Sequence, residues 1–184
     1  MNLNGMLSCQ VIRAAFPTGL PQYTMAKTLW NKTLSFEEIR DEYFNCAYGE
    51  KATLVQNYLE KLSDLTNLRF VIGEVKLSPE EVNERYTLLK QTVIDFRNEY
   101  LEQLKDSSAE WNYLYVHSFL VPIFADTFMA RYNGDEEAVA KYSLEFKATI
   151  DEYKPIIDAV CDDYGLDYSI IAKYLKRHAP IQKA

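Results

Sequence analysis

The chain has 184 residues, a length that fits one domain with peripheral additions. Hydrophobic residues make up 48% of it and are spread along its whole length, which excludes an intrinsically disordered protein. Its 27 acidic and 20 basic residues give a net charge of −7, which opposes attraction to nucleic-acid phosphates and to anionic membranes. We therefore expect neither nucleic acid nor a membrane as a partner.

The cysteines and the N-terminus indicate the compartment. Cys9, Cys46 and Cys161 lie far apart and form no Cys-x-x-Cys pair, so they predict neither a zinc site nor a disulfide framework. An odd number of cysteines favours a reducing compartment, although one disulfide plus one thiol stays open. No basic region followed by an apolar run opens the chain, so we expect no signal peptide and a soluble, cytoplasmic protein.

The first part of the chain predicts an irregular segment followed by three helices. Residues 1–16 show no helical amphipathic pattern and begin with turn-prone Asn and Gly, so we expect them to be extended. A first helix is predicted within Pro17–Asn31. A second should begin at Ser35, whose Ser-x-x-Glu pattern is a capping box, and end at Gly49. A third is predicted from Lys51 to about Asn67.

A long apolar stripe marks the next predicted helix, which begins after Ser78 and Pro79. Its apolar residues alternate four and three apart, as in a bundle helix that packs against a neighbour: Val82, Tyr86, Leu89, Val93, Phe96 and Tyr100. The following segment, about Ala109 to Tyr132, is apolar on nearly all sides, which predicts a central core helix that Pro122 kinks.

The last part of the chain predicts two further helical segments. A helix should run from Glu136 and bend at Pro155, and Asp167 can cap a last short helix that ends at Lys176–His178. Few Gly and Pro interrupt these segments. The sequence therefore predicts an all-α fold, an irregular bundle of about six to seven helices over residues 17–184 with a short extended N-terminal segment.

Groups capable of catalysis do not form a recognisable site in the sequence. Most acidic pairs fall in predicted first helical turns, where carboxylates complement the positive end of the helix. Neither histidine has a Glu three residues before it, as a di-iron bundle requires. We interpret His117 as a hydrogen-bonded core histidine rather than a general base, and His178 as a solvated residue at a helix end. We therefore expect no catalytic residue, no metal site and no cofactor in this chain.

Aromatic residues are abundant, with 14 Tyr, 9 Phe and 2 Trp. Sugar rings stack on aromatic faces, so a carbohydrate surface is one interpretation. Most of the tyrosines instead fall at helical spacing on apolar stripes, which favours packing inside the bundle. The exceptions are Tyr23, Trp30 and Tyr48, which belong to the region that carries a family resemblance.

That region resembles a segment of bacterial glycoside-hydrolase-like proteins, a family of unknown function that is distantly similar to α-glucuronidases. The resemblance covers about residues 7–60 and rests on short apolar motifs: Phe16-Pro17-Thr18-Gly19-Leu20, Tyr23, Leu29-Trp30-Asn31, Phe36, Tyr43-Phe44 and Ala47-Tyr48-Gly49. In such proteins a (β/α)8 barrel is followed by a helical C-terminal domain. At Lys32, directly after Asn31, this chain departs from the proline that the pattern often has.

The resemblance implies a role for the chain as a helical C-terminal accessory domain. Residues 1–16 would be the end of a barrel that the rest of the chain lacks, and the barrel would hold the catalytic carboxylates. The barrel domain of the parent protein, and a second copy in a homodimer, are the partners it implies. If any residues touch carbohydrate, the resemblance points to Gln10, Arg13 and Tyr23, although loop solvation or packing is the favoured interpretation for Gln10 and Arg13.

Two hypotheses about function therefore stand. The first is a non-catalytic scaffold or dimerisation domain of a glycoside-hydrolase-like protein, which predicts an exposed apolar face where the barrel would pack. The second is an autonomous helical module that binds a partner protein, for which residues 1–16 would be dispensable. In both, we expect the chain by itself not to be an enzyme, and the resemblance leaves open that the parent protein is a glycoside hydrolase.

Overall fold

The computed structural model describes residues 15–162 together with Leu175 and His178. The predicted extended segment therefore lies outside the described residues except for its last two positions. The same holds for most of the predicted last helix, from Asp167 onward. Ala15 is tied to the far end of the described chain, because its backbone N–H donates to the carbonyl oxygen of Val160 at 2.9 Å.

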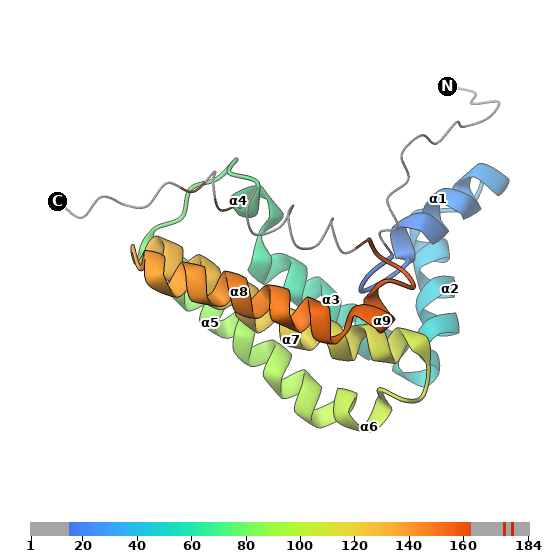
Figure 1. Ribbon diagram of the computed structural model, residues 1–184. Helices are drawn as coiled ribbons and strands as arrows, with labels where there is room; N and C mark the ends of the chain where they lie inside the picture. Colours follow the sequence, from blue (N-terminus) through green and yellow to red (C-terminus); the bar gives the residue numbers. More distant parts are fainter. Residues whose placement is uncertain (1–14, 163–174, 176–177, 179–184) are drawn as a thin grey trace.

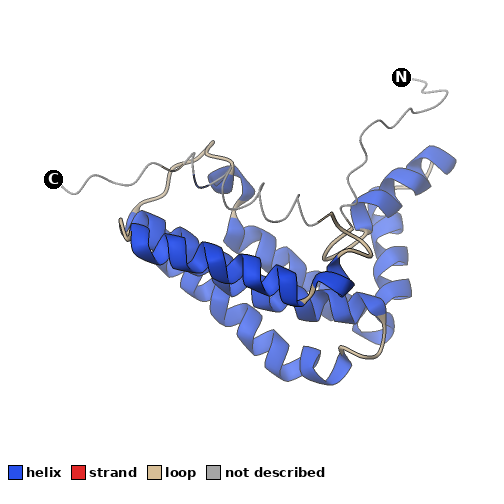
Figure 2. Ribbon diagram, viewed as in Figure 1, coloured by secondary structure: helices blue, strands red, loops and turns tan. Residues whose placement is uncertain are grey.

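The fold is all-α, as predicted. The described residues form helices and turns without a β-strand (Figure 2). In chain order the helical elements are α1 (Leu20–Trp30), α2 (Phe36–Tyr48), η1 (Gly49–Lys51), α3 (Ala52–Thr66), α4 (Leu68–Val71), α5 (Pro79–Phe96), η2 (Arg97–Leu101), α6 (Glu102–Leu104), α7 (Ala109–Tyr132), α8 (Glu136–Glu152) and α9 (Lys154–Ile157).

The long helices α5, α7 and α8 lie side by side and form the body of the molecule (Figure 1). Helix α7 packs against both α5 and α8, and α3 packs against α5. Helix α2 then packs on α3, and α1 packs on α2. The helical hairpin α1–α2 therefore stands at one end of the molecule, with α1 at its edge (Figure 1).

The apolar stripe of α5 is buried, as its spacing predicts. Val82, Tyr86, Leu89 and Val93 are fully buried, and Phe96 is nearly so. The Tyr86 ring stacks against Phe128 of α7 with a centroid distance of 5.5 Å. Each buried apolar side chain of this kind contributes about 1.5–3 kcal/mol before the entropy of ordering it is subtracted. The α5–α7 contact is therefore a main source of stability.

Helix α7 is the central helix that the sequence predicts, with ten buried residues. By length and composition it is the one helix of the described part that could cross a membrane, but half of its most apolar window is buried inside the protein. That burial fits the core helix of a soluble protein, which is the predicted role. Helix α7 packs on both α5 and α8. Two packing partners explain why its surface is apolar on nearly all sides.

Pro122 lies inside α7, and the helix continues on both sides of it. Proline has no backbone N–H, so the carbonyl oxygen of Ser118, four residues earlier, lacks its usual helical donor. The guanidinium of Arg97 donates to that oxygen at 3.4 Å and also lies 4.3 Å from the centroid of the Phe119 ring. Arg97 opens the π-helical segment η2, which follows α5 directly. The sequence predicted neither this segment nor its contact with α7.

The predicted helix starts are confirmed at the level of individual hydrogen bonds. Ser35 and Ser78 each accept a bond from the backbone N–H three residues later, and Glu38 and Glu81 reach back to the cap N–H in both cases. The short helix α4 was not predicted. It begins at Asn67, whose left-handed backbone (φ 52°) lets its side chain accept from the N–H of Phe70.

The interpretation of His178 as a solvated residue is wrong. Its side chain is buried, with Nδ1 2.8 Å from the hydroxyl of Tyr132 and Nε2 3.1 Å from the carbonyl oxygen of Val71. The ring also lies 4.8 Å from that of Phe70. The prediction rested on the basic residues near a predicted helix end, which are a local sequence pattern. Such a pattern cannot show that His178 packs against α4 and α7.

Candidate protein interaction surface

The hydroxyl group of Tyr43 attaches the start of α1 to α2. It accepts a hydrogen bond from the Gly19 N–H at 2.9 Å and another from the Thr18 hydroxyl at 3.1 Å. Gly19 is the N-cap residue of α1 and has no side chain to cap the helix, and Pro21 follows in the first turn. Tyr43 therefore fixes the position of the helix start from outside the helix.

Polar side chains also join the middle of α1 to α2. Glu42 accepts from the Tyr23 hydroxyl at 2.8 Å and from the Lys27 ammonium at 2.7 Å. The hydrogen bond to Lys27 lowers the pKa of Glu42 and raises the pKa of Lys27, while the hydrogen bond to Glu42 raises the pKa of the Tyr23 hydroxyl. The ring of Tyr23 lies 5.5 Å from that of Tyr43. The contact between α1 and α2 is therefore largely polar and aromatic.

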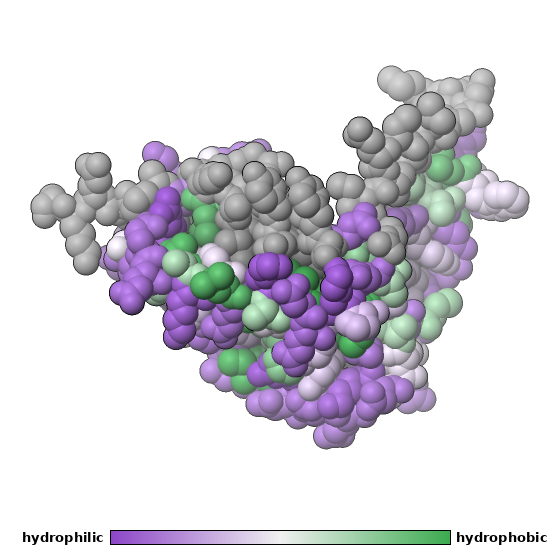
Figure 3. Space-filling view, viewed as in Figure 1, coloured by the Kyte–Doolittle hydropathy of each residue, from purple (hydrophilic) through white to green (hydrophobic). Residues whose placement is uncertain are grey.

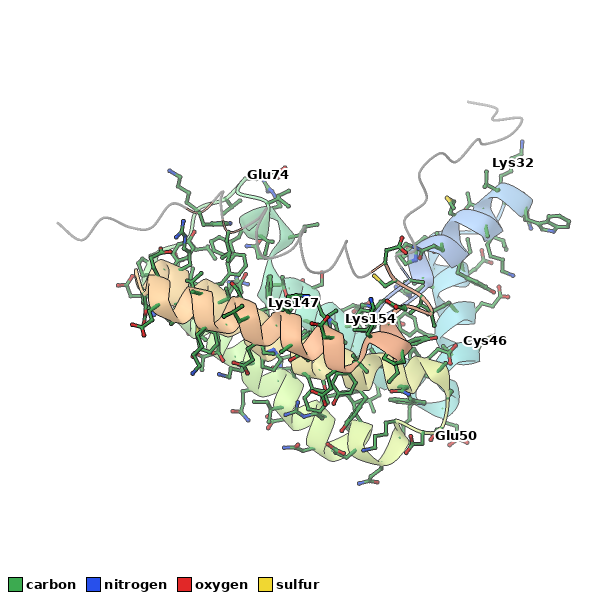
Figure 4. All side chains as sticks on the ribbon, in the orientation of Figure 1. Lys32, Cys46, Glu50, Glu74, Lys147 and Lys154 are labelled. Carbon is green, nitrogen blue, oxygen red and sulfur yellow. The ribbon has the colours of Figure 1, made fainter. Side chains whose placement is uncertain are left out.

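Three large apolar side chains in the second half of α1 are exposed to solvent. Met25 is 44% exposed, Leu29 51% and Trp30 91%, and Phe36, which begins α2, is 51% exposed. None of the residues of α1 is fully buried. Lys32 extends outward at the same end of the hairpin (Figure 4). We call Met25, Leu29, Trp30 and Phe36 the α1 surface.

The α1 surface differs from the rest of the exposed protein. Over α8 and α5 the surface is mainly hydrophilic, with scattered apolar side chains (Figure 3). The other large exposed apolar residues of the described chain, Leu68, Leu88 and Leu144, lie singly on α4, α5 and α8. Single exposed leucines are ordinary on soluble proteins, whereas several large apolar side chains exposed within one short stretch of chain, as in residues 25–36, are typical of interaction sites.

Of the three predicted carbohydrate contacts, only Tyr23 lies among the described residues. Gln10 and Arg13 lie outside the described residues. Tyr23 is described, and its hydroxyl is engaged with Glu42. Of the other aromatic exceptions, Tyr48 is buried, which raises the pKa of its hydroxyl, and its ring lies 5.1 Å from that of Trp111. Of Tyr23, Trp30 and Tyr48, only Trp30 has a side chain that is almost fully exposed.

Several acidic pairs of the described chain lie where the helix-end interpretation places them, whereas Asp41 and Glu42 lie in the middle of α2. Glu37 and Glu38 lie in the first turn of α2, and Glu80 and Glu81 lie in the first turn of α5. Among residues 15–162, Leu175 and His178, no three side chains of His, Cys, Asp or Glu come close enough to hold a metal ion. Acids in these positions stabilise the helices that they begin.

His117 lies in apolar surroundings, as predicted, but the predicted hydrogen bond is missing at one of its nitrogens. Its Nδ1 is buried and has no hydrogen-bond partner in the described structure. Burial lowers the pKa of the imidazole to about 4, so the ring is neutral at pH 7. The nearest aromatic contact is the ring of Phe16, 5.9 Å away. A general base would need a proton donor to act on and a pKa closer to neutral.

Comparison with models of known protein families, with curated proteins and with solved structures finds no match to this chain. The resemblance to glycoside-hydrolase-like proteins therefore stays a prediction, and the case for function depends on the surface and cavities of the chain itself.

Proposed function

We propose that this chain is a non-catalytic helical docking domain that binds a protein partner through the α1 surface. The observation that carries the proposal is the orientation of α1. Its residues Tyr23 and Lys27 contact α2, while Met25 and Leu29 on the opposite side of the helix, and Trp30 at its end, are exposed. Large apolar side chains that are left exposed on a helix are candidates for contact with a second surface.

The composition of the α1 surface suits protein recognition. Tryptophan is enriched among the residues that dominate binding energy at protein interfaces, and Trp30 has nearly all of its surface available. Residues spaced four apart, such as Met25 and Leu29, are the anchors by which a helix occupies an apolar groove. The charged residues Lys32 and Glu37 flank the apolar residues and would form part of a polar rim.

The resemblance adds a more specific form of the proposal. Leu29 and Trp30 belong to the motif that resembles the region between a glycoside-hydrolase-like barrel and its helical domain. In this form the partner is a barrel domain of the same parent protein, and the chain is its scaffold or dimerisation domain. The second candidate is an autonomous module whose partner is another protein, and the same surface supports it.

The size of the native product separates these two forms. An antibody raised against this chain is used on an extract of the source cells, in which the upstream reading frame is either intact or disrupted. A band far above 21.4 kDa that disappears on disruption supports the barrel-linked domain. A band near 21.4 kDa refutes that form and leaves the autonomous module.

Self-association of the purified chain shows whether the partner is a second copy. Sedimentation velocity of the purified chain measures self-association with and without the substitution Trp30→Ala. If the partner is a second copy, the unsubstituted chain dimerises and the substitution weakens the dimer. If the chain remains a monomer, a barrel domain or another protein is the partner, and crosslinking from position 30 then identifies it.

A further inference from the structure

The charge of the α1–α2 hairpin differs from that of the whole protein. The chain has a net charge of −7. From Leu20 to Tyr48, which spans α1 and α2, three basic and four acidic residues nearly cancel. Two copies of an acidic protein repel each other over most of their surfaces. The hairpin is therefore a part of the surface where a second copy meets little electrostatic repulsion.

Most charges of the hairpin are already engaged within it. Lys27 forms an ion pair with Glu42 at 2.7 Å, and Arg40 forms one with Asp41 at 2.9 Å. The carboxylate of Glu38 accepts from the N-cap residue of α2. Two charges of the hairpin remain, and they have opposite signs.

These two charges, Lys32 and Glu37, lie beside the α1 surface. Lys32 is two residues from Trp30, and Glu37 directly follows Phe36. Both are exposed, and neither side chain has an ion-pair partner in the part of the chain that the structure describes. Lys32 extends outward from the end of the hairpin (Figure 4). The α1 surface therefore has one free cation and one free anion at its edge.

An apolar surface with one free charge of each sign at its edge is complementary to itself. In a two-fold interface the same surface meets its own copy, so residue i of one copy contacts residue j of the other, and j contacts i. Lys32 of each copy then pairs with Glu37 of the other, while the apolar residues of both copies pack between these pairs. A second copy of the chain thus satisfies both free charges at once.

We propose that the partner of the α1 surface is a second copy of this chain, in a two-fold dimer with Trp30 at its centre and two Lys32–Glu37 ion pairs at its rim. This inference rests on the docking proposal and names its partner. Trp30 suits the centre because it is 91% exposed in the single chain, and tryptophan is enriched among the residues that dominate binding energy at interfaces.

Charge reversal tests the pairing. Sedimentation velocity of the full chain measures the dissociation constant of the dimer, at low ionic strength because salt screens exposed charges. We expect Lys32→Glu and Glu37→Lys each to raise that constant by about tenfold, because two attractive contacts per dimer become repulsive. The matched control is Lys61→Glu, at an exposed position on α3. It changes the net charge as Lys32→Glu does and should raise the constant far less.

A mixture of the two charge-reversed chains distinguishes a second copy from any other partner. The variant Lys32→Glu has two acidic residues at the rim, and Glu37→Lys has two basic residues. Across a two-fold interface between these variants, both rim contacts join opposite charges. We therefore expect the mixture, and the double variant Lys32→Glu/Glu37→Lys, to dimerise as the original chain does.

Circular dichroism establishes that each variant is folded. Should one fail to fold, a zero-length carbodiimide crosslink tests the same contact in the original chain. We expect it to join Lys32 of one copy to Glu37 of the other in a mixture of isotope-labelled and unlabelled chains, and mass spectrometry identifies the linked peptides. Crosslinks between copies that omit both residues would contradict the proposed pairing.

Three other results would overturn this inference. The first is an original chain that stays monomeric at every concentration tested. The second is an unchanged dissociation constant in both charge-reversed variants. The third is a mixture of these variants that dimerises no better than either variant alone. The docking proposal does not fall with them, because it requires only that position 30 crosslinks to a protein surface in the source cells.

Discussion

The α5–α7 pair and the α1–α2 hairpin use apolar side chains in opposite ways. In the pair, the apolar stripe of α5 faces α7, and Tyr86, Leu89 and Val93 are fully buried. In the hairpin, α1 turns Tyr23 and Lys27 toward α2 and leaves Met25, Leu29 and Trp30 exposed. The first region therefore maintains the fold, whereas the second leaves apolar side chains exposed, and the docking proposal rests on them.

The largest expected effect tests the stabilising role of the pair. Phe128 of α7 is 1% exposed, and its ring lies within 6.0 Å of those of Phe70, Tyr86 and Phe124. We expect Phe128→Ala to lower the free energy of unfolding by about 3–5 kcal/mol, because it removes a large buried side chain and leaves a cavity. Urea denaturation measures the change. A loss below about 1 kcal/mol would contradict the assignment of the core to this region.

A smaller effect concerns the contact between Arg97 and the carbonyl of Ser118. We expect Arg97→Met to cost about 1 kcal/mol, because it leaves that oxygen without a donor beside Pro122. In the background Pro122→Ala, where residue 122 regains its N–H, the same substitution should cost clearly less. Urea denaturation of the four proteins gives the coupling energy. Equal costs in both backgrounds would show that Arg97 does not replace the helical donor.

The pH dependence of the hairpin has a definite sign. Hydrogen bonds from Ser35 hold the pKa of Glu38 below its ordinary value of 4.5. A lowered folded-state pKa gives a stabilisation that is present above pH 4.5 and is lost as the pH falls through the folded pKa. We therefore expect Glu38→Gln to destabilise the protein slightly at pH 7, with the difference shrinking below pH 4.5. Thermal unfolding of both proteins from pH 7 to pH 3 measures it, and a difference that grows at low pH would contradict this sign.

The smallest expected effect on stability is at Trp30. Because its side chain is 91% exposed, Trp30→Ala should change the free energy of unfolding by less than about 0.5 kcal/mol. The same substitution should abolish binding of the partner. Urea denaturation checks the first part, and a change above about 1 kcal/mol would mean that Trp30 belongs to the core.

Short sequence patterns predicted much of the fold, but only the structure shows which face of α1 packs against α2. The capping residues Ser35 and Ser78 and the stripe of α5 are encoded within a few residues, and each is found where the sequence places it. In α1 the sequence offers two possible packing faces, one with Tyr23 and Lys27 and one with Met25 and Leu29, and the spacing alone does not select between them.

Tertiary contacts also explain what the sequence missed elsewhere. The burial of His178 depends on Tyr132 and Val71, which lie 46 and 107 residues earlier in the chain. The π-helical segment after α5 makes its contact with Ser118 across the interface to α7. The lack of a partner for the buried Nδ1 of His117 likewise depends on the helices packed around it and not on its own segment. The sequence pattern of one segment therefore cannot predict contacts with residues so far away in the chain.

The most direct test of the docking claim is site-specific photo-crosslinking in the source cells. Trp30 is replaced by p-benzoylphenylalanine, and the matched control has the same replacement at Leu144, an exposed position on α8. We predict that irradiation links position 30, and not position 144, to one discrete protein surface. Mass spectrometry of the linked peptides then assigns that surface to a barrel domain of the same polypeptide, a second copy or another protein. Equal crosslinking from both positions, or none from position 30, would contradict the account.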